Sequence, residues 1–452
     1  MSKEKISQLL ATYGTVLVLL LLCAAFSLIT LEEQTTTTTA AAKRLAKRVA
    51  SQNAADTKVL VLVQNGASRE KFAESLTDGL NKAGLDVVQT FVGQPPDARK
   101  TLVKLGETGT RLDVVATDPL MGNFCAQQLQ KLGQQHPTLA KAKAWQPDPP
   151  MLRYWPLFLK KNNLLNIMKQ ISVVAIIAIG MTMVIVTAGI DLSVGSLIAF
   201  SGVITALAIG NLGSTEPTMI HLLLGSGAGI LACALIGMFT GGMVTLFSIP
   251  PFIVTLGIMF IARGLAHIIS GGNAIKIHNE AFDWLGSGRD FLGLYNSVVL
   301  MLLLYGAAHI LMTRTSIGRY IYAVGGNPEA AWLSGVPVNW VLVFVYTLCG
   351  LLAGLGGVMV ASLHVYGDPE TGNLVELQVI AAVVVGGTSL AGGQGRILGT
   401  LVGALIIAVI HNGMNLTTGL EDGYIQHVVY GAVILIAVLV DQLKNRGLKS
   451  AG

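Results

Sequence analysis

Long apolar runs separated by short polar segments cover most of the chain, and one long polar stretch interrupts them near the amino terminus. The apolar run 15–28 precedes this stretch, which extends from about residue 31 to residue 150. A membrane-spanning helix needs about 20 apolar residues. Nine further apolar runs follow, several of them shorter than this, at 167–186, 193–209, 220–247, 252–269, 297–312, 338–361, 377–385, 398–410 and 425–440. The pattern predicts an all-α polytopic membrane protein with about ten transmembrane helices and a small inserted extracytoplasmic α/β domain.

The polar stretch 31–150 has the periodicity of an α/β fold. Buried-strand runs alternate with amphipathic helical patterns, the strands at 58–63, 86–92 and 112–117 and the helices at 68–83 and 95–105. This order predicts a β-α-β-α-β unit near 58–118 with a parallel sheet and right-handed crossovers. We interpret 127–150 as a linker back to the membrane part, 151–452.

Charge placement predicts the orientation in the membrane. Residues 1–30 are expected to form an uncleaved first transmembrane helix, because two lysines precede the apolar run and no small-x-small cleavage site follows it. A cleaved signal peptide is the alternative. With the amino terminus inside, Arg314 and Arg319 fall in a cytoplasmic loop and the basic carboxyl terminus is also inside, as the positive-inside rule requires. The stretch 31–150 then lies outside.

Composition agrees with this interpretation and argues against other classes of protein. Hydrophobic residues make up 52% of the 452 positions and charged residues only 12%, whereas a soluble domain carries about 25% charged residues. The formal net charge of +5 is not gathered into a basic patch with interleaved aromatic residues, so we expect no nucleic-acid partner. Only Cys125 of the four cysteines lies in a polar segment, and the spacing indicates neither a disulfide framework nor a metal site.

An acidic residue interrupts the apolar pattern in the sequence VTAGIDLSVGS. An acid at membrane depth is costly unless it lines a cavity or caps a broken helix. In one interpretation, Asp191 accepts backbone N–H bonds at the start of the next helix, as an N-cap does. In the other, Gly189, Asp191, Ser193 and Gly195 belong to an interrupted helix that shapes a translocation pathway. Both interpretations can hold together.

A second motif lies in the predicted cytoplasmic loop 314–337. Asn327 is placed to cap a short helix with Pro328 at its first position and Glu329 in its first turn, and Gly335 ends it. Such a helix between two spans lies along the membrane face or contacts a partner. We expect it to dock a cytoplasmic motor subunit, and a rigid connector is the alternative. The residues expected to take part in coupling are Arg319, Gly326, Asn327, Pro328, Glu329, Ala330, Ala331 and Gly335.

A third motif, ELQVIAAVVVGGTSLAGGQG, begins at Glu376. A phosphate-binding loop is a weak interpretation, because the pattern GxxxxGK[ST] does not occur in the chain. A tight helix–turn–helix re-entry at the membrane fits better, and Glu376 is a candidate pathway residue. Thr255, Asn412 and Asn415 are further pathway candidates within spans, although each fits the role of an interhelical hydrogen-bonding group better.

These three motifs resemble the three signature stretches of the permease subunit of ribose/galactose/xylose-type ABC sugar importers. The resemblance extends from about residue 163 to residue 443 and includes the first span. It implies a homodimeric permease of the bacterial inner membrane that moves a monosaccharide by alternating access and is not itself an enzyme. The implied partners, besides lipid, are a second copy, a periplasmic sugar-binding protein, and a cytoplasmic ATPase that carries ATP and Mg and docks at 319–336. The chain itself is expected to hold no cofactor.

Two departures from the family pattern stand out. Gln378 lies where the family usually has an acidic residue, and ordinary members lack the stretch 31–150. This insert resembles, more weakly, one lobe of the sugar-binding proteins, so it could present ligand on the periplasmic side, dock the binding protein, or bind nothing. Two alternatives remain for the whole chain. One is an importer of a nucleoside or other small polar solute, and the other is a membrane-bound sensor whose outer α/β domain detects ligand.

Overall fold

The computed structural model describes residues 3–33, 37–54, 56–148, 154–213, 217–417, 419–420 and 423–449. The chain forms two compact units, of which the first joins Met1–Thr30 to Pro156–Gly452 and the second is Leu31–Trp155. The start of the threonine run at 35–39 and the predicted end of the insert at Pro150 lie outside the described residues.

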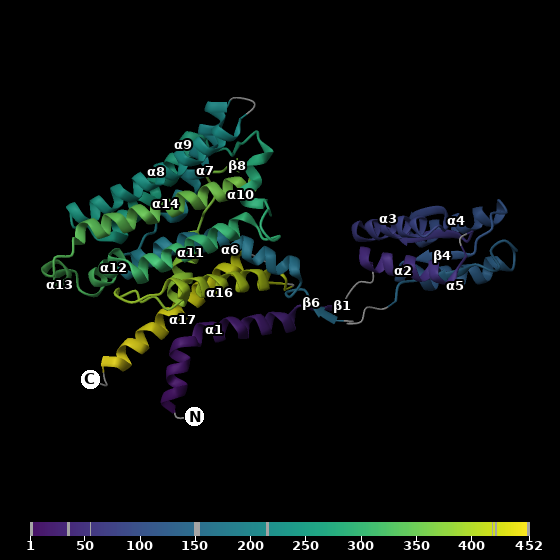
Figure 1. Cartoon of the computed structure of the whole chain (residues 1–452), viewed down its shortest axis with the longest axis horizontal. Helices are drawn as coiled ribbons and strands as arrows, with labels where there is room; N and C mark the ends of the chain where they lie inside the picture. The colour runs from purple at the N-terminus through teal and green to yellow at the C-terminus, as the bar shows by residue number, and fades with distance from the viewer. Residues whose placement is uncertain are drawn as a thin grey trace. The chain divides into compact units, whose positions relative to one another are not determined.

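The first unit is a bundle of helices (Figure 1). A small antiparallel sheet, formed by β7 and β8, connects the loop after α9 to the end of α14. The elements in chain order are α1 (Lys3–Ile29), α6 (Lys161–Val186), α7 (Val194–Gly213), α8 (Met219–Leu246), α9 (Pro251–Ser270), β7 (Ile275–Lys276), η1 (Glu280–Asp283), α10 (Trp284–Ser287), α11 (Asn296–Arg314), α12 (Ser316–Gly326), α13 (Pro328–Leu333), α14 (Val338–His364), β8 (Tyr366–Gly367), α15 (Val375–Val385), α16 (Ile397–Asn415) and α17 (Gly423–Lys449).

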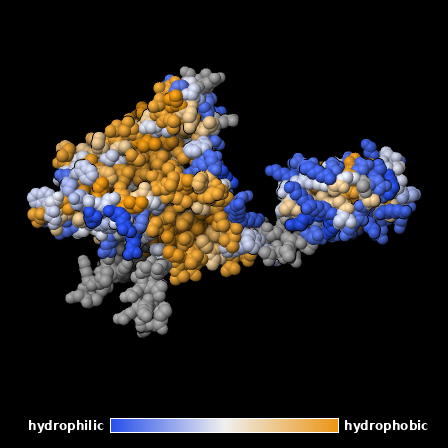
Figure 2. Space-filling model, viewed as in Figure 1, coloured by the Kyte–Doolittle hydropathy of each residue, from blue (hydrophilic) through white to orange (hydrophobic). Residues whose placement is uncertain are grey.

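Among the described residues, seven helices are long and apolar enough to cross a membrane, namely α6, α7, α8, α9, α11, α14 and α16. Shorter apolar helical stretches lie at Gly14–Ile29, Val375–Val385 and Gly423–Ile436. Figure 2 shows hydrophobic side chains over much of the visible face of this unit, as a lipid-facing surface requires.

The apolar run predicted at 377–385 is not a complete spanning helix. The corresponding helix, α15, has 11 residues, and at 1.5 Å per residue it extends only about 16 Å. The hydrocarbon core of a bilayer is about 30 Å thick. Positive φ angles at Gly372 (80°) and Leu374 (61°) prevent the helix from starting earlier, and the glycine turn after Val385 prevents it from continuing.

The helix α14 lies at the centre of the bundle and packs against α6, α7 and α8 (Figure 1). Glycines permit the close approach of α8: a methyl group added at Gly237 would overlap the carbonyl oxygen of Tyr346. Small residues at helix interfaces are the common solution in lipid, where packing replaces the hydrophobic driving force. At the edge of the bundle α1 packs against α16, with the Phe26 ring against Gly413.

The second unit is a parallel sheet covered by helices on both faces. The strand order is β3-β2-β4-β5, and every pair is parallel. Its elements are α2 (Thr39–Gln52), β2 (Lys58–Gln64), α3 (Ala67–Lys82), β3 (Asp86–Gly93), α4 (Pro95–Glu107), β4 (Val114–Thr117), α5 (Pro119–Gly133) and β5 (Lys143–Trp145), while β1 (Leu31–Glu33) and β6 (Tyr154–Pro156) form a separate two-stranded sheet.

The alternating direction of the side chains along β2 explains why helices cover both faces of the sheet. Val59, Val61 and Val63 pack with α2 and α3 in one apolar core, and Leu60 and Leu62 pack with α4 and α5 in another. Because successive side chains of a strand point to opposite faces, an uninterrupted apolar run is what a strand covered on both sides needs.

The prediction of a linker over 127–150 is wrong as far as residue 145. The α/β unit continues past residue 118, because Asp118 caps α5 by accepting a hydrogen bond from the Met121 N–H (2.8 Å) and Pro119 occupies the first helical position. Leu129 and Leu132 are buried, and so is Cys125, which is wholly inaccessible despite its polar sequence neighbourhood. The spacing of these apolar residues in a mostly polar stretch is that of an amphipathic helix.

Candidate functional site

The apolar pattern breaks between α6 and α7, as the motif around Asp191 predicts. α6 ends at Val186, α7 begins at Val194, and the Asp191 side chain between them is 2% exposed. Its Oδ1 accepts hydrogen bonds from the Ser193 N–H (2.9 Å) and the Ser193 hydroxyl (2.6 Å). Asp191 therefore does not cap α7. It forms a turn with Ser193, whose carbonyl accepts the first helical bond of α7, from Leu197 (2.9 Å).

Two residues of α14 complete the surroundings of this turn. The Cys349 thiol lies close enough to the Asp191 carboxyl to interact with it electrostatically, and the Tyr346 hydroxyl lies where a methyl group on Gly189 would overlap it. Tyr346 is 0% exposed, and its hydroxyl has no hydrogen-bond partner within the described part of the chain. The polar groups of Asp191, Ser193, Cys349 and Tyr346 are thus buried together where α6, α7 and α14 meet.

A second interruption lies between α14 and α15. After β8 the chain turns through 368–374 before α15 begins at Val375. This interruption contacts the start of α7, directly after the first one: a methyl group on Gly195 would overlap both the carbonyl oxygen of Gly372 and the carboxylate of Glu376. Gly195, in the first turn of α7, therefore leaves room for the backbone of the second interruption and for Glu376. The structure therefore brings Gly189, Asp191, Ser193, Gly195 and Glu376 into one connected cluster.

The helix α9 contacts both interruptions. The Thr255 hydroxyl, which is buried, donates a hydrogen bond to the Ile190 carbonyl (3.2 Å). Arg263, which our sequence analysis did not select, donates to the carbonyls of Pro369 (2.7 Å) and Thr371 (2.6 Å). The sequence did contain a signal for Arg263, because a lone arginine within an apolar span is by default a candidate functional residue.

Asn412 and Asn415, the other two pathway candidates, form their hydrogen bonds outside the two interruptions. Asn412 and Asn163 exchange two amide hydrogen bonds of 2.9 Å each, between α16 and α6. The Asn415 amide oxygen accepts a hydrogen bond from Gln426 on α17 (2.6 Å). Both residues satisfy interhelical hydrogen bonds, and their partners are not on either interruption.

The loop 314–337 contains the expected capped helix, α13. The Asn327 Oδ1 accepts a hydrogen bond from the Ala330 N–H (3.0 Å), with Pro328 at the first helical position. Gly335 has φ 83°, the left-handed conformation that ends many helices. Of the predicted coupling residues, Arg319, Gly326, Asn327, Pro328, Glu329, Ala330 and Gly335 are exposed and Ala331 is buried. Beside them Trp332 and Leu333 are 66% and 73% exposed.

The glycine-rich turn after α15 joins this loop to the first interruption. The Gly393 N–H donates to the Val186 carbonyl (2.8 Å), and the Tyr322 hydroxyl on α12 donates to the Gly395 carbonyl (2.7 Å). Burial raises the pKa of Tyr322, so this hydroxyl remains a donor at neutral pH. A methyl group on Gly325 would overlap the same Val186 carbonyl. The three sequence motifs therefore meet at one point, the carboxyl end of α6.

The second unit offers polar side chains at the carboxyl ends of its strands. The Asp118 carboxylate, 0% exposed, accepts a hydrogen bond from the Gln64 N–H (3.3 Å) and lies 3.7 Å from the Arg69 Nε. The Asn65 amide oxygen accepts one from Gln94 (2.7 Å). Ligands of open α/β sheets bind outside this edge, where the strand order reverses. Here that point lies between β2, which ends at Gln64, and β4, which Asp118 directly follows.

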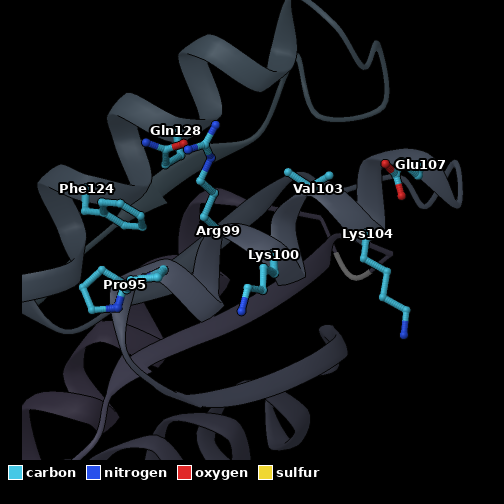
Figure 3. Close-up of a pocket in the computed structure, with 9 residues that line it drawn as sticks. Pro95, Arg99, Lys100, Val103, Lys104, Glu107, Phe124 and Gln128 are labelled. Atoms are coloured by element: carbon cyan, nitrogen blue, oxygen red, sulfur yellow. The ribbon is translucent and has the colours of Figure 1, made fainter.

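A groove of about 600 Å³ lies on the same unit between α4 and α5. Figure 3 shows Arg99 extending from α4 toward Gln128 on α5, whereas Lys100 and Lys104 point away from α5. Phe124 provides an apolar wall. The groove has more basic than acidic side chains.

The chain matches the family "Branched-chain amino acid transport system / permease component" over residues 163–438. It is 44% identical over 294 residues to the ribose import permease protein RbsC of Escherichia coli, covering 64% of this chain and 88% of that protein. Identity is 38% over 291 residues to the L-arabinose ABC transporter permease protein AraH of Azospirillum brasilense (64% and 83%). It is 36% over 290 residues to the D-allose transport system permease protein AlsC of Escherichia coli (64% and 86%). No solved structure matches the chain at a significant level. These similarities confirm the resemblance that the three motifs carry.

Proposed function

Because the chain belongs to the family of branched-chain amino acid transport system permease components, we propose that it is the membrane-spanning permease subunit of an ABC importer for a monosaccharide. The three relatives compared above are named for ribose, L-arabinose and D-allose, which are all monosaccharides. The observation that carries the proposal is the contact of Gly325 with Val186 and Gly393. This contact joins α12, which directly precedes the expected docking helix α13, to the end of α6 and to the glycine turn after α15.

The chain moves substrate and performs no covalent chemistry, and ATP hydrolysis takes place on a separate subunit. α13 offers that subunit an exposed apolar pair, Trp332 and Leu333, beside the exposed charge of Glu329. A displacement of α13 moves α12, and Gly325 and Tyr322 transmit it to the end of α6 and to the glycine turn. Packed interfaces of this kind switch between discrete arrangements rather than deform continuously. Alternating access to the cluster around Asp191 follows.

The proposed topology places the amino terminus, the loop 314–337 and the carboxyl terminus in the cytoplasm and the insert in the periplasm. The segment 368–374 and α15 together make one crossing of the inner membrane, half irregular and half helical. A second copy of the chain and a periplasmic sugar-binding protein complete the importer. A cysteine introduced at the exposed position Thr108 should react with an impermeant maleimide in intact cells. One at Glu329 should react only after permeabilisation, and the reverse pattern would overturn the topology.

Uptake of labelled sugars tests the function directly. Cells lacking the chain should lose uptake of at least one of ribose, arabinose or allose, and the restored chain should recover it. If cells lacking the chain lose only the uptake of a nucleoside or of another small polar solute, that solute and not a monosaccharide is the substrate. Unchanged uptake of all of them, with a lost transcriptional or chemotactic response to sugar, would establish a sensor instead.

Coupling to the ATPase is tested by a proline within α13. Ala331 is the position to change, because its N–H donates to the Asn327 carbonyl (3.0 Å) and proline removes this donor. We expect Ala331→Pro to insert normally and to lose co-purification with the ATPase. Ala331→Gly is the matched comparison, since glycine keeps the N–H at the same position and removes only the methyl group. Equal co-purification of Ala331→Pro and the wild type would refute the docking role.

The insert is proposed to act on the periplasmic side, by presenting ligand or by docking the binding protein. The Thr30 carbonyl accepts a hydrogen bond from the Leu157 N–H (2.9 Å), so a short Gly/Ser linker can replace everything between these two residues. We expect the shortened permease to assemble and to transport more slowly. We also expect the isolated fragment 37–148 to bind monosaccharides weakly or not at all. Unchanged uptake kinetics would reduce the insert to a decoration.

A further inference from the structure

Arg263 lies inside α9, a helix that is otherwise apolar and long enough to cross the membrane. A charged side chain at this depth is costly and as a rule pairs with other groups or faces a water-filled cavity. Arg263 is half-buried, and its Nη1 donates hydrogen bonds to the carbonyl oxygens of Pro369 (2.7 Å) and Thr371 (2.6 Å). The guanidinium therefore binds backbone that is more than 100 residues further along the chain.

The bound backbone belongs to the second interruption, 368–374. Its residues Gly372 and Leu374 have left-handed φ angles of 80° and 61°, so this segment cannot be helical. Irregular backbone at membrane depth is tolerated only where protein buries it or where it lines a water-filled cavity, since its polar groups need partners. Arg263 supplies the donors that two of these carbonyl oxygens require.

Charge reinforces the two hydrogen bonds. The carboxylates of Asp368, Glu370 and Glu376 lie close enough to Arg263 to interact with it electrostatically. His267, one turn further along α9, lies 3.5 Å from Glu370. Three carboxylates therefore interact with one guanidinium, and replacement of the guanidinium by a neutral side chain removes both its donors and its countercharge.

The same helix also holds the first interruption, through Thr255 and the Ile190 carbonyl (3.2 Å). Thr255 and Arg263 are eight residues apart, about 12 Å along α9. The second interruption contacts Gly195, in the first turn of α7 directly after the first interruption. α9 is thus joined at two levels to the irregular backbone that surrounds the cluster of Asp191 and Glu376.

We propose that Arg263 is a positioning residue for transport: it holds the segment 368–374, and with it Glu376, in the conformation that lines the substrate pathway. This inference rests on the proposed function and assigns a role within the same site. Because Thr255 and Arg263 belong to one helix, a displacement of α9 moves both interruptions together.

The test uses the complete importer, reconstituted in liposomes with its ATPase and binding protein. Arg263→Met should lower sugar uptake at least tenfold while ATP hydrolysis per assembled complex stays within twofold of the wild type. Arg263→Lys, which keeps the charge, should recover part of the uptake. Gly264→Ala is the matched control, because a methyl group there meets nothing within 4 Å. A merely structural role would lower assembly, uptake and hydrolysis in parallel, and that result, like unchanged uptake, would overturn the proposal.

Hydrogen exchange supplies a readout that does not depend on sugar. In the assembled complex, the amides of 368–375 should exchange about tenfold faster in Arg263→Met than in the wild type or Gly264→Ala. Equal exchange in all three proteins would show that Arg263 does not hold the segment. A wild-type complex that moved no sugar would refute the proposed function, yet the exchange rates would still decide whether Arg263 positions this backbone.

Discussion

Replacement of Gly325 by alanine should loosen the contact at which the three motifs meet. Gly325 is buried near the end of α12, and an added methyl group would overlap the Val186 carbonyl oxygen and lie 2.7 Å from the Gly393 nitrogen. Both neighbours are backbone atoms, which cannot rotate out of the way as a side chain can. Gly326, the next residue, is exposed, and a methyl group there meets nothing within 4 Å. The two neighbouring glycines therefore form a matched pair.

The magnitude follows from the overlap. An extra methyl group in a well-packed site costs typically about 1–3 kcal/mol, whereas alanine gains up to about 1 kcal/mol over glycine within a helix. Gly326→Ala has only the gain, so the two variants should differ by about 1–3 kcal/mol in free energy of unfolding. One kcal/mol corresponds to about 2–4 °C in Tm for a domain of about 150–250 residues, so we expect Gly325→Ala to unfold at least about 2 °C below Gly326→Ala.

Tryptophan fluorescence of the purified permease in detergent measures this difference, and sugar uptake by the same variants measures its functional cost. Gly325→Ala should transport more slowly than Gly326→Ala, because the displaced α12 no longer moves with the end of α6. Identical unfolding temperatures and identical uptake in the two variants would refute the packing argument and, with it, the coupling route through Gly325.

Three further predictions concern other contacts. Burial, reinforced by the charge of Asp118, raises the pKa of Cys125 from 9.0 to about 12, so the thiol should resist maleimide at pH 8 in the folded protein and react once the protein is denatured, as mass spectrometry would show. A double-mutant cycle of Asn163→Ala and Asn412→Ala should give a favourable coupling of about 0.6–1.7 kcal/mol in thermal unfolding, and zero coupling would contradict the paired amides. Gly237→Ala, which places a methyl group on the Tyr346 carbonyl, should lower the Tm, whereas Gly242→Ala, in open space on the same helix, should not.

The apolar runs locate the long helices well because lipid imposes one requirement along the whole length of a span. The run 167–186 corresponds to α6, and the break at Asp191 lies where the polar and glycine residues predict it. The capped helix after Asn327 was also readable, since capping depends on residues three positions apart. These features are local, so the sequence contains the information in one place.

The features that the sequence did not reveal depend on distant partners. Arg263 finds its acceptors 106 and 108 residues away, on backbone carbonyls that no side chain marks. The sequence favoured an interhelical hydrogen-bonding role for Asn412 but could not name its partner, Asn163, which lies 249 residues earlier. The stretch after residue 127 was mistaken for a linker although its helix is amphipathic, because the strand that follows has only 3 residues and is defined by its pairing with β4.

The packing of α1 against α16 has a consequence for biosynthesis. Phe26 and Gly413, which are in contact, are 387 positions apart in the chain. Ribosomes add about 5–20 residues per second, so roughly 20–80 s separate the emergence of these two residues. In the proposed topology, α1 resides in the bilayer without its final neighbour during this interval, while the polar second unit is exported and the other spans are inserted. The apolar stretch Gly14–Ile29 must therefore be retained by lipid alone, and the bundle closes when one of the last helices made returns to the first.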